Sequence, residues 1–531
     1  MPRATRASDI GLRVGRFATG PRNEISDVAG VRVAATTLVH GEGPLRRGVG
    51  PVRTGVTAIL PQSLERMGHP LFAGTHRLNG NGELTGLEWI RESGTLTTPI
   101  CLTNTHAVGV VHDAMIAWSL DRVADAPPWS LPVAGETWDG VLNDVNGFHV
   151  TADHARSALD AAAALPSGAP VPRGNQGGGT GMICHGLKGG NGTASRVLPD
   201  SLGGFTVGVF VQANHGRRHR LTIGGLQLGR EGGPLDAAKI PLPWERIGAS
   251  GAHAAHPDDP RGGAGSIIVV VATDAPLIPS QLDRIAQRAS LGIGRVGGVG
   301  EHTSGDLVLA FSTANGSLPV EETEPQQPFA VAVEMVVNAH LSPLLEATVD
   351  ATEEAIVDAL LAGETMVGAN GATATALPLD VVRDAGVDVC LMHMQGTPRT
   401  MQDDPHYDDV LREVGDYLRA RVDACVAAGI DPGRIAVDPG IGFGKTVEHN
   451  LVLLAGVREL GEATGCPVLI GASRKRFLGA VLGDPDADRL VATIVAGVAA
   501  VAHGAWVLRV HDVAAHREAL QVLLALRRVQ A

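Results

Sequence analysis

The spacing of the apolar runs changes near residue 370, and this change constrains the fold more than any other feature of the chain. Up to about residue 330, short apolar runs broken by glycine mix with helical patterns. Strands and helices without strict βαβ alternation are typical of sheets layered between helices. One helical pattern follows Pro279, with Ser280 as its expected N-cap, and another covers residues 341–366. Residues 1–380 therefore predict a layered α/β domain.

Beyond that point the apolar runs become regular. They start at residues 387, 434, 466 and 505, and helical stretches separate them. This is the βα cadence of a parallel sheet, and polar residues follow each run, where α/β barrels place their sites. Only four such units are present, whereas eight close a barrel. We predict a partial, four-unit β/α barrel over residues 381–531, with the Gly-containing stretch 367–378 as the boundary.

Composition restricts the class of protein. A chain of 531 residues is too long for one ordinary core, and its net charge of −13 argues against nucleic acid as a partner. The five cysteines are scattered without a CxxC pair, so we expect reduced packing thiols, Cys184 among them. Neither a secretory signal nor an apolar run of about 18 residues is visible. We expect a cytoplasmic protein with no membrane partner.

A run of small residues, 262–265, leads directly into Ser266 and a purely apolar strand. The serine is either part of an ordinary loop-to-strand turn or a residue that becomes an N-terminus. In the second case its own α-amine, with a pKa near about 8, supplies the base that a serine nucleophile needs. Gly265 permits the strained geometry of an N-to-O acyl shift. Ser304 and Asp306, at i and i+2 before another strand, can share one face, with Ser304 relaying and Asp306 orienting.

Two other motifs in residues 1–380 are weaker indications of a functional site. His215 and His219 have the i, i+4 spacing of a metal-ligand pair, but the glycine and arginines around them predict a surface loop. The glycines of residues 177–192 are followed by no GKS/T, so turns between buried strands account for them better than a phosphate site. We expect neither a metal nor an organic cofactor here. The loop-like stretch 248–263 resembles an insertion that would slow cleavage before Ser266.

Several separated motifs carry a family resemblance. "GGGTGMICHGLKGGNGTASR", "VQANHG", "AGSIIVVVATDAPL" and "SGDLVLAFSTAN" together resemble the self-processing L-aminopeptidase/D-esterase and β-peptidyl aminopeptidase family, over residues 8–380. The resemblance implies an αββα sandwich of the N-terminal-nucleophile type, cleaved between Gly265 and Ser266 into two subunits, and a homo-oligomer.

The same resemblance implies roles for individual residues. Ser266 is the nucleophile, with Ser304 and Asp306 as its partners. Asn214 is the amide that donates to the oxyanion, and Glu136 is the carboxylate that receives the substrate's ammonium group. Trp138 stands where the family pattern leads us to expect a tyrosine, so a hydroxyl contact is missing from the substrate site.

A second resemblance covers residues 385–531. "DPGIGFGKT" fails as a phosphate-binding loop because Pro439 stands where the first glycine should be. With "CLMHMQGTPRTMQ", "GASRKRFLG" and "RVHDV" it instead resembles the second half of dihydropteroate synthase. The implied roles are pterin contacts from Asp438 and Lys475, pocket walls from Met394 and Phe443, pyrophosphate binding by Arg509 and His511, and the p-aminobenzoate side at Ser473 and Arg474.

The first half of that synthase has no counterpart here, including its Asn-Val-Thr-Pro-Asp-Ser loop. We therefore read the pterin-site residues as relics of a gene fusion rather than as working parts. Transferase activity, and any Mg²⁺, would require a complete barrel assembled with another half, from a second chain for example. A four-strand half barrel leaves strand edges uncovered, so it must pair with such a half or pack on other parts of the chain.

Two functions of different classes remain. The first is a self-processed serine aminopeptidase or amidase that releases N-terminal residues from short peptides, amides or esters. The alternative is a chimera of an unprocessed peptidase fold and a pterin-binding fragment, catalytically incomplete alone. Hydrolysis of an aminoacyl amide that depends on Ser266 separates them.

Overall fold

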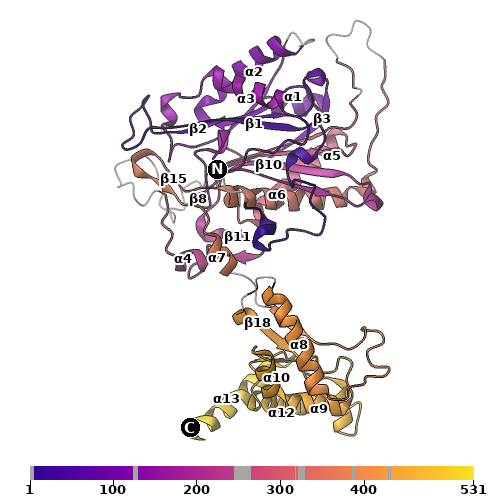
Figure 1. Cartoon of the computed structure of the whole chain (residues 1–531). Coiled ribbons are helices and arrows are strands. Elements are labelled where there is room, and N and C mark those ends of the chain that lie inside the picture. Colours follow the sequence, from indigo (N-terminus) through magenta and orange to yellow (C-terminus); the bar gives the residue numbers. More distant parts are fainter. Residues whose placement is uncertain are drawn as a thin grey trace. The chain divides into compact units, whose positions relative to one another are not determined.

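The chain forms two compact units, residues 1–385 and 386–531 (Figure 1). The computed structural model describes residues 5–123, 129–243, 265–316, 318–320, 329–384, 389–427, 430 and 432–530. Residues 367–378, predicted to form the boundary, pack on the first unit instead. There Ala372 and Ala374 are fully buried against Leu142, because a short hairpin carries them into a small apolar cluster.

Two stacked sheets form the centre of the first unit. The strands of one sheet run in the order β1 (Arg32–His40), β2 (Val52–Leu60), β5 (Ile100–Asn104) and β6 (Val133–Thr137). The other sheet has the order β4 (Thr95–Leu96), β3 (Leu71–Gly80), β14 (Gly305–Ser312), β13 (Ser266–Thr273), β10 (Thr206–Asn214) and β9 (Gly190–Val197).

Helices cover the outer faces of both sheets (Figure 1). α2 (Val108–Arg122) and α3 (Ala152–Ala164) pack on the four-stranded sheet. α5 (Pro279–Arg295) and α6 (Ser342–Ala362) pack on the six-stranded sheet. The layers therefore follow the predicted order αββα. The shorter elements are α1 (Leu87–Ser93), α4 (Pro234–Ala237), α7 (Leu379–Asp384), β7 (Ile183–Cys184), β8 (Leu187–Lys188), β11 (Thr222–Ile223), β12 (Leu226–Gln227), β15 (Met366–Val367) and β16 (Thr373–Ala374).

β13 is buried on both faces, and its sequence reflects this. Ile268 and Val270 face the core between the sheets, whereas Ile267 and Val269 face α5 and α6. Both faces of the strand are buried, so its sequence is continuously apolar rather than alternating.

Two predicted helix boundaries are wrong. α5 begins at Pro279 itself with Ile278 at the N-cap, and not after Ser280. Proline is favoured at the first helical position because its missing N–H would have no helical partner there. α6 ends at Ala362, and Met366 already starts β15.

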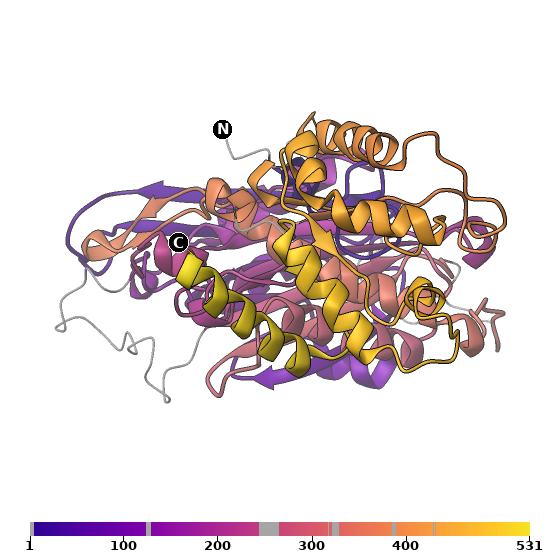
Figure 2. The ribbon, with the colours of Figure 1, turned by 90° about the horizontal axis from the view of Figure 1, so that it is seen from below.

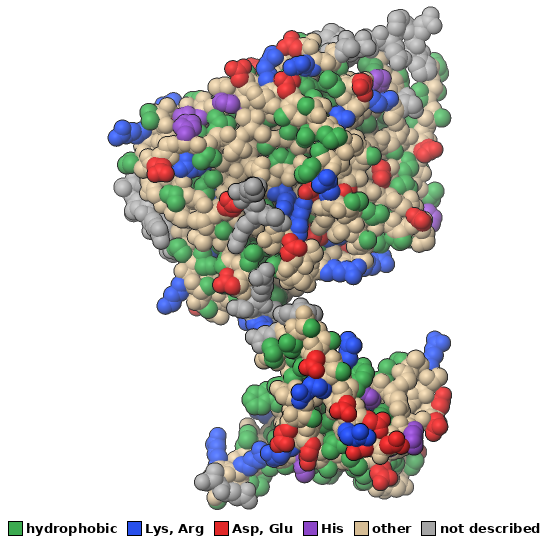
Figure 3. All heavy atoms as spheres, viewed as in Figure 1, with side chains coloured by type: hydrophobic (Ala, Val, Ile, Leu, Met, Phe, Trp, Pro, Cys, Tyr) green, Lys and Arg blue, Asp and Glu red, His purple; other side chains and the backbone are tan. Residues whose placement is uncertain are grey.

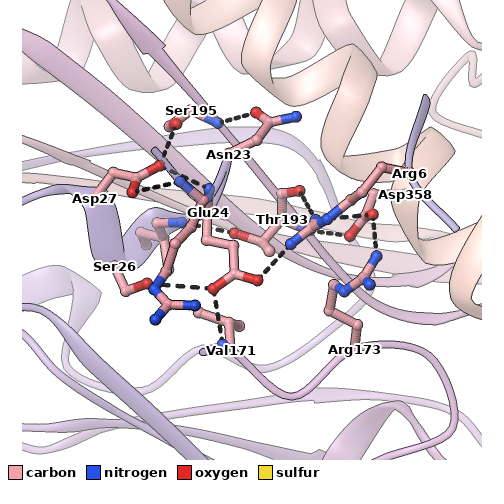
Figure 4. Close-up of polar contacts among 12 residues, drawn as sticks. Arg6, Asn23, Glu24, Ser26, Asp27, Val171, Arg173, Thr193, Ser195 and Asp358 are labelled. Carbon is pink, nitrogen blue, oxygen red and sulfur yellow. Dashed lines mark hydrogen bonds and ion pairs between the residues drawn. The ribbon is translucent and has the colours of Figure 1, made fainter. Parts of the chain in front are cut away.

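A buried polar network ties the N-terminal segment to α6 and β9 (Figure 4). Asp358 of α6 accepts hydrogen bonds from Arg6 Nη1 at 2.9 Å, from Arg173 Nη1 at 2.5 Å and from the Thr193 amide at 3.1 Å. Arg6 also pairs with Glu24, whose pKa is raised by burial. One carboxylate thus holds three segments that are distant in the sequence.

Replacing Asp358 by alanine is expected to lower the free energy of unfolding by about 3 kcal/mol, because two half-buried guanidinium groups lose their shared, buried counter-charge. Urea denaturation followed by circular dichroism measures the change. Glu92→Ala, which removes an exposed carboxylate of the same unit, is the matched control and should change stability by less than about 0.5 kcal/mol. Equal stabilities of the two variants would contradict the prediction.

The second unit contains short parallel strands and helices. β17 (Val389–Met392) pairs with β18 (Ile435–Asp438), β19 (Leu469–Ile470) pairs with β20 (Val507–Leu508), and a parallel bridge joins Val437 to Val468. The helices are α8 (Val410–Ala427), α9 (Val447–Ala455), α10 (Val457–Thr464), α11 (Arg476–Val481), α12 (Leu490–Ala502) and α13 (Val513–Gln530). Figure 2 shows α12 and α13 lying side by side. That these strands represent part of a barrel stays a prediction.

Within the described part of the chain, no helix is both long and apolar enough to cross a bilayer. On the face shown in Figure 3, acidic and basic side chains are interspersed over each unit.

Candidate active site

Ser266 is the first residue of β13 and is buried between two neighbouring strands. It lies opposite Asn214, the last residue of β10, in an antiparallel ladder. On its other side, the Gly305 amide at the start of β14 donates a hydrogen bond of 3.0 Å to Ser266 Oγ. The hydroxyl is thus held by the backbone of β14, and the residue itself lies opposite an asparagine of β10.

Gly265 occupies a place that no other residue fits. Its φ of +79° is left-handed, and a Cβ there would lie 1.9 Å from the Asn214 carbonyl oxygen. The same Cβ position lies 2.9 Å from Asn214 Nδ2. The peptide bond between Gly265 and Ser266 is therefore close to the end of β10 and its amide side chain. The predicted insertion, residues 248–263, lies outside the described residues.

The side-chain amide of Asn214 is fixed at both ends. Its Oδ1 accepts from the Ile183 amide at 2.8 Å, and its Nδ2 donates to the Trp138 carbonyl oxygen at 2.9 Å. Because Oδ1 accepts from the Ile183 amide, the NH₂ group of Asn214 is the end that lies toward Gly265. One of its two N–H bonds points to Trp138, which leaves the other for a further acceptor. Trp138 contributes its backbone here, while its ring is 44% exposed and lies beside Gly140.

Ser304 and Asp306 meet as the i, i+2 spacing predicts. Ser304 Oγ donates to Asp306 Oδ2 at 2.8 Å, and Asn79 Nδ2 contacts Ser304 Oγ at 3.2 Å. Burial raises the pKa of Asp306 from its ordinary 3.8 to about 6, and the negative charge of Glu301 acts in the same direction, while the Ser304 hydrogen bond opposes both. Asp306 pairs with Ile267 across the parallel ladder, so this group adjoins the nucleophile.

The raised pKa of Asp306 predicts a stability cost at neutral pH. The folded state keeps the proton to a higher pH than the unfolded state, so stability is full below about pH 4 and falls as the pH rises through about 6. A pKa difference of this size corresponds to about 3 kcal/mol at most. Asp306→Asn should therefore unfold at higher urea concentration than the wild type at pH 7.5, and this advantage should vanish near pH 4. A lower stability at pH 7.5 would contradict the prediction.

Glu136, at the end of β6, approaches the site from the other sheet. Its Oε1 accepts from the Glu83 amide at 3.1 Å, its Oε2 accepts from the Thr105 hydroxyl, and burial raises its pKa. Gly82 separates it from the nucleophile's neighbour: a Cβ on Gly82 would lie 3.1 Å from Glu136 Oε1 and 3.0 Å from Gly305 Cα. Gly82 alone thus lies between the Glu136 carboxylate and Gly305, whose amide binds Ser266 Oγ.

The five predicted residues lie at the ends of neighbouring strands: Ser266 is opposite Asn214, Ser304 and Asp306 flank the Gly305 that binds Ser266 Oγ, and Glu136 is at the end of β6. Four residues that hold them were not predicted from the sequence: Asn79, Gly82, Thr105 and Gly305. A glycine between Ser304 and Asp306 was a readable signal for a backbone donor. The other three act across strands that only the fold brings together.

His215 corrects a prediction. It was expected in a surface loop with His219, but only His219 is exposed, whereas His215 is buried behind Asn214. There it meets His185 and Cys184, and the three offer ligand atoms within 4.8 Å of one another. Among the described residues, this is a group with the chemistry to hold a metal.

In the second unit, the predicted pterin-site residues gather at the carboxyl ends of the strands. Asp438, the last residue of β18, accepts from Arg509 Nη2 at 3.2 Å, and burial raises the pKa of Asp438. Lys475 Nζ lies 3.8 Å from the centre of the Phe443 ring. Two further hydrogen-bonded pairs involve predicted residues: Ser473 Oγ lies 2.9 Å from His511 Nδ1, and Arg474 donates to Asp512 at 2.6 Å. Met394 is half-buried just beyond β17.

The two parts of the chain are similar to two different protein families. The model of Peptidase family S58 matches residues 23–374, and that of the Pterin binding enzyme family matches residues 312–511. Both include residues 312–374, which the structure places in the first unit. The dihydropteroate synthase of Neisseria meningitidis serogroup C is 50% identical over 147 residues, 28% of this chain. The match spans 52% of that relative, about half its length.

The peptidase relationship is the more extensive. The β-peptidyl aminopeptidase BapA of Sphingosinicella microcystinivorans is 46% identical over 373 residues, which are 70% of this chain and 89% of the relative. The solved L-aminopeptidase D-Ala-esterase/amidase of Ochrobactrum anthropi, described as a variant of the Ntn hydrolase fold, is 42% identical. It matches with a TM-score of 0.61 over 72% of this chain and 98% of its own. The chain is a hydrolase with a dihydropteroate-synthase-like C-terminal part, and it belongs to peptidase family S58.

Proposed function

We propose that the chain cleaves itself between Gly265 and Ser266 and then acts as a serine aminopeptidase. In the first step, Ser266 Oγ attacks the carbonyl carbon of Gly265. The C–N bond breaks, the hydroxyl proton passes to the departing nitrogen, and Gly265 remains as an ester on Oγ. Water then hydrolyses this ester and releases the Gly265 carboxylate. Ser266 is left with a free α-amine beside its hydroxyl.

The single observation that carries this proposal is the hydrogen bond from the Gly305 amide to Ser266 Oγ, at a residue that lies opposite Asn214 in the antiparallel ladder. Gly305 orients the oxygen, and the remaining N–H of Asn214 is available to an oxyanion that forms on the Gly265 side. A loop-to-strand turn without a catalytic role requires neither the left-handed Gly265 nor an amide clamped by two backbone groups.

After cleavage, the α-amine of Ser266 serves as the base for each turnover. With a pKa near about 8, it can take the hydroxyl proton at neutral pH and return it to the leaving amine of the substrate. Ser304 and Asp306, bonded to each other, complete a polar chain at the start of β14. The acyl group is carried on Ser266 Oγ and is released by water.

The substrate class follows from Glu136. A buried carboxylate close to the nucleophile selects ligands with a free ammonium group, which suits peptides, amides or esters cleaved after their first residue. We include β-peptides among them because the relative from Sphingosinicella microcystinivorans is a β-peptidyl aminopeptidase.

Glu136→Gln should test this recognition. Loss of the charge is expected to weaken transition-state binding of substrates with a free α-amine by about 1.5–3 kcal/mol. This corresponds to a fall in kcat/KM of roughly 10- to 100-fold. The same variant should still cleave itself, because the internal peptide bond carries no ammonium group. An unchanged kcat/KM for aminoacyl amides would contradict the role of Glu136.

The proposed function as a whole is tested by the intact mass of freshly purified protein under denaturing conditions. Two fragments, residues 1–265 and 266–531, are expected, together with hydrolysis of a chromogenic aminoacyl amide. A single chain of 54.8 kDa without hydrolysis would reject it. In that case the alternative, an unprocessed chimera, would stand.

A second function is favoured by the gathered residues of the second unit. We propose that this unit retains weak affinity for a pterin but does not transfer it, since the chain matches only half the length of the synthases. Calorimetry with the full chain and a dihydropterin measures the affinity. Asp438→Asn should abolish the heat signal, and a signal unaffected by that change would contradict binding at this place.

A further inference from the structure

Three side chains behind Asn214 form a cluster that the proposed hydrolysis does not use. Cys184 ends β7, His185 follows it, and His215 comes directly after Asn214. All three are buried, with exposed fractions of 0%, 0% and 3%. Cys184 Sγ lies 3.9 Å from His215 Nδ1, and the two imidazole rings meet edge to face with centres 5.3 Å apart. The cluster brings one sulfur and two imidazoles together from two chain segments.

The histidines leave nitrogen atoms unused. Neither His185 Nε2 nor His215 Nε2 has a hydrogen-bond partner within the parts of the chain that the structure describes, and both atoms are buried. An unsatisfied buried nitrogen is costly, so each such atom requires an explanation. His185 Nδ1 lies 3.0 Å from the Arg217 carbonyl oxygen, a bond in which only the nitrogen can donate. This bond fixes the tautomer and leaves a lone pair on Nε2, as in metal-binding histidines.

We propose that Cys184, His185 and His215 form a binding site for a soft transition-metal ion, with Cu⁺ as its best occupant. Two imidazole nitrogens and a thiolate are the ligands that copper and zinc prefer over Mg²⁺ or Ca²⁺. The site does not depend on the proposed function, because its ligands take no part in the hydrolysis. It replaces the expectation from the sequence that this part of the chain binds no metal.

Charge favours a monovalent ion. One thiolate and one Cu⁺ sum to zero, whereas a divalent ion would leave a buried positive charge, which is expensive without a partner. Two basic side chains lie near the cluster: Arg218 Nε donates to the His185 carbonyl oxygen at 2.9 Å, and Nζ of the fully buried Lys188 donates to the carbonyl oxygens of Met182 at 2.9 Å and Gly189 at 2.8 Å. Positive charge on these side chains repels any additional net charge on the bound ion.

The position of the site gives it a consequence for Asn214. The Ile183 amide, which orients the Asn214 side chain, adjoins Cys184 in sequence, and Asn214 itself adjoins His215. A metal ion bound by Cys184, His185 and His215 would therefore join the two segments that aim this amide.

The test uses the full chain produced in cells supplied with copper or, separately, with zinc, because buried ligands are best loaded during folding. After anaerobic purification with a chelator, metal content is measured by mass spectrometry. The wild type should retain copper stoichiometrically, and Cys184→Ser should lose it. His185→Gln is the second ligand variant in case the first does not fold. Cys101→Ser, which alters an equally buried cysteine outside the cluster, should keep the wild-type content.

Two results would overturn the proposal. One is a wild-type copper and zinc content at the background of unsupplied cells. The other is retention of copper by Cys184→Ser and His185→Gln at the level of Cys101→Ser, which would place the metal elsewhere. Retention of zinc and not copper, lost in both ligand variants, would overturn the assignment of Cu⁺. Cobalt in place of zinc would then report the thiolate ligand through its charge-transfer absorption.

Discussion

Ser266→Ala is expected to yield a single chain of 54.8 kDa with no hydrolysis of aminoacyl amides. Alanine removes the Oγ that both attacks Gly265 and carries the acyl group, so cleavage and turnover are lost together. Since Ser266 is buried and its Oγ accepts only one amide hydrogen bond in the described structure, the fold should persist. Intact mass under denaturing conditions and a chromogenic assay measure the two effects.

A control variant distinguishes the loss of the nucleophile from the loss of any other serine hydroxyl. Ser290→Ala removes a hydroxyl on α5 that has no hydrogen-bond partner among the described residues, and it should be cleaved and active like the wild type. Ser266→Cys keeps a nucleophile and should retain self-cleavage at a reduced rate. An active, cleaved Ser266→Ala would reject Ser266 as the nucleophile.

Asn214→Ala is the prediction with the next largest effect. Removing one oxyanion donor is expected to lower kcat by about 10²- to 10³-fold, with KM changed little, because the N–H binds the charge of the transition state and not the substrate. Self-cleavage should slow as well, since Asn214 Nδ2 lies beside Gly265. Time-resolved mass spectrometry and steady-state kinetics give both rates.

Asn214→Asp is the matched variant for the same position. Its carboxylate has nearly the same shape and can still accept from the Ile183 amide, but it cannot donate. If donation is the role of Asn214, the aspartate variant should be as slow as the alanine variant. A kcat close to that of the wild type in Asn214→Asp would show that the side chain only supports the end of β10.

The sequence predicted the layered fold and the site to different extents, for physical reasons. The run Ser266–Thr273 reads as a buried strand because both of its faces are apolar, and the i, i+2 spacing alone placed Ser304 with Asp306. The helix beginning at Pro279 was missed by two residues because tertiary contacts and proline, not Ser280, define its start. The family resemblance supplied Asn214 and Glu136, which no local pattern indicates.

What the sequence could not provide were contacts across strands. Gly82 is unremarkable in the chain, yet its closeness to Gly305 brings Glu136 near the amide that binds Ser266 Oγ. His215 was expected to be exposed because its neighbours are glycine and arginines; its burial depends on His185, 30 residues away along the chain. Long-range packing of this kind has no periodicity to detect.

The strand order of the six-stranded sheet determines what a cut at Ser266 would leave behind. β13 and β14 belong to the segment after the cut, and they lie between β3 and β10, which belong to the segment before it. The two polypeptides would thus share one hydrogen-bonded sheet, with the later segment inserted into the earlier one. Such a pair unfolds as one cooperative body, and its halves, once separated, can reassemble only by a concentration-dependent reaction between two chains.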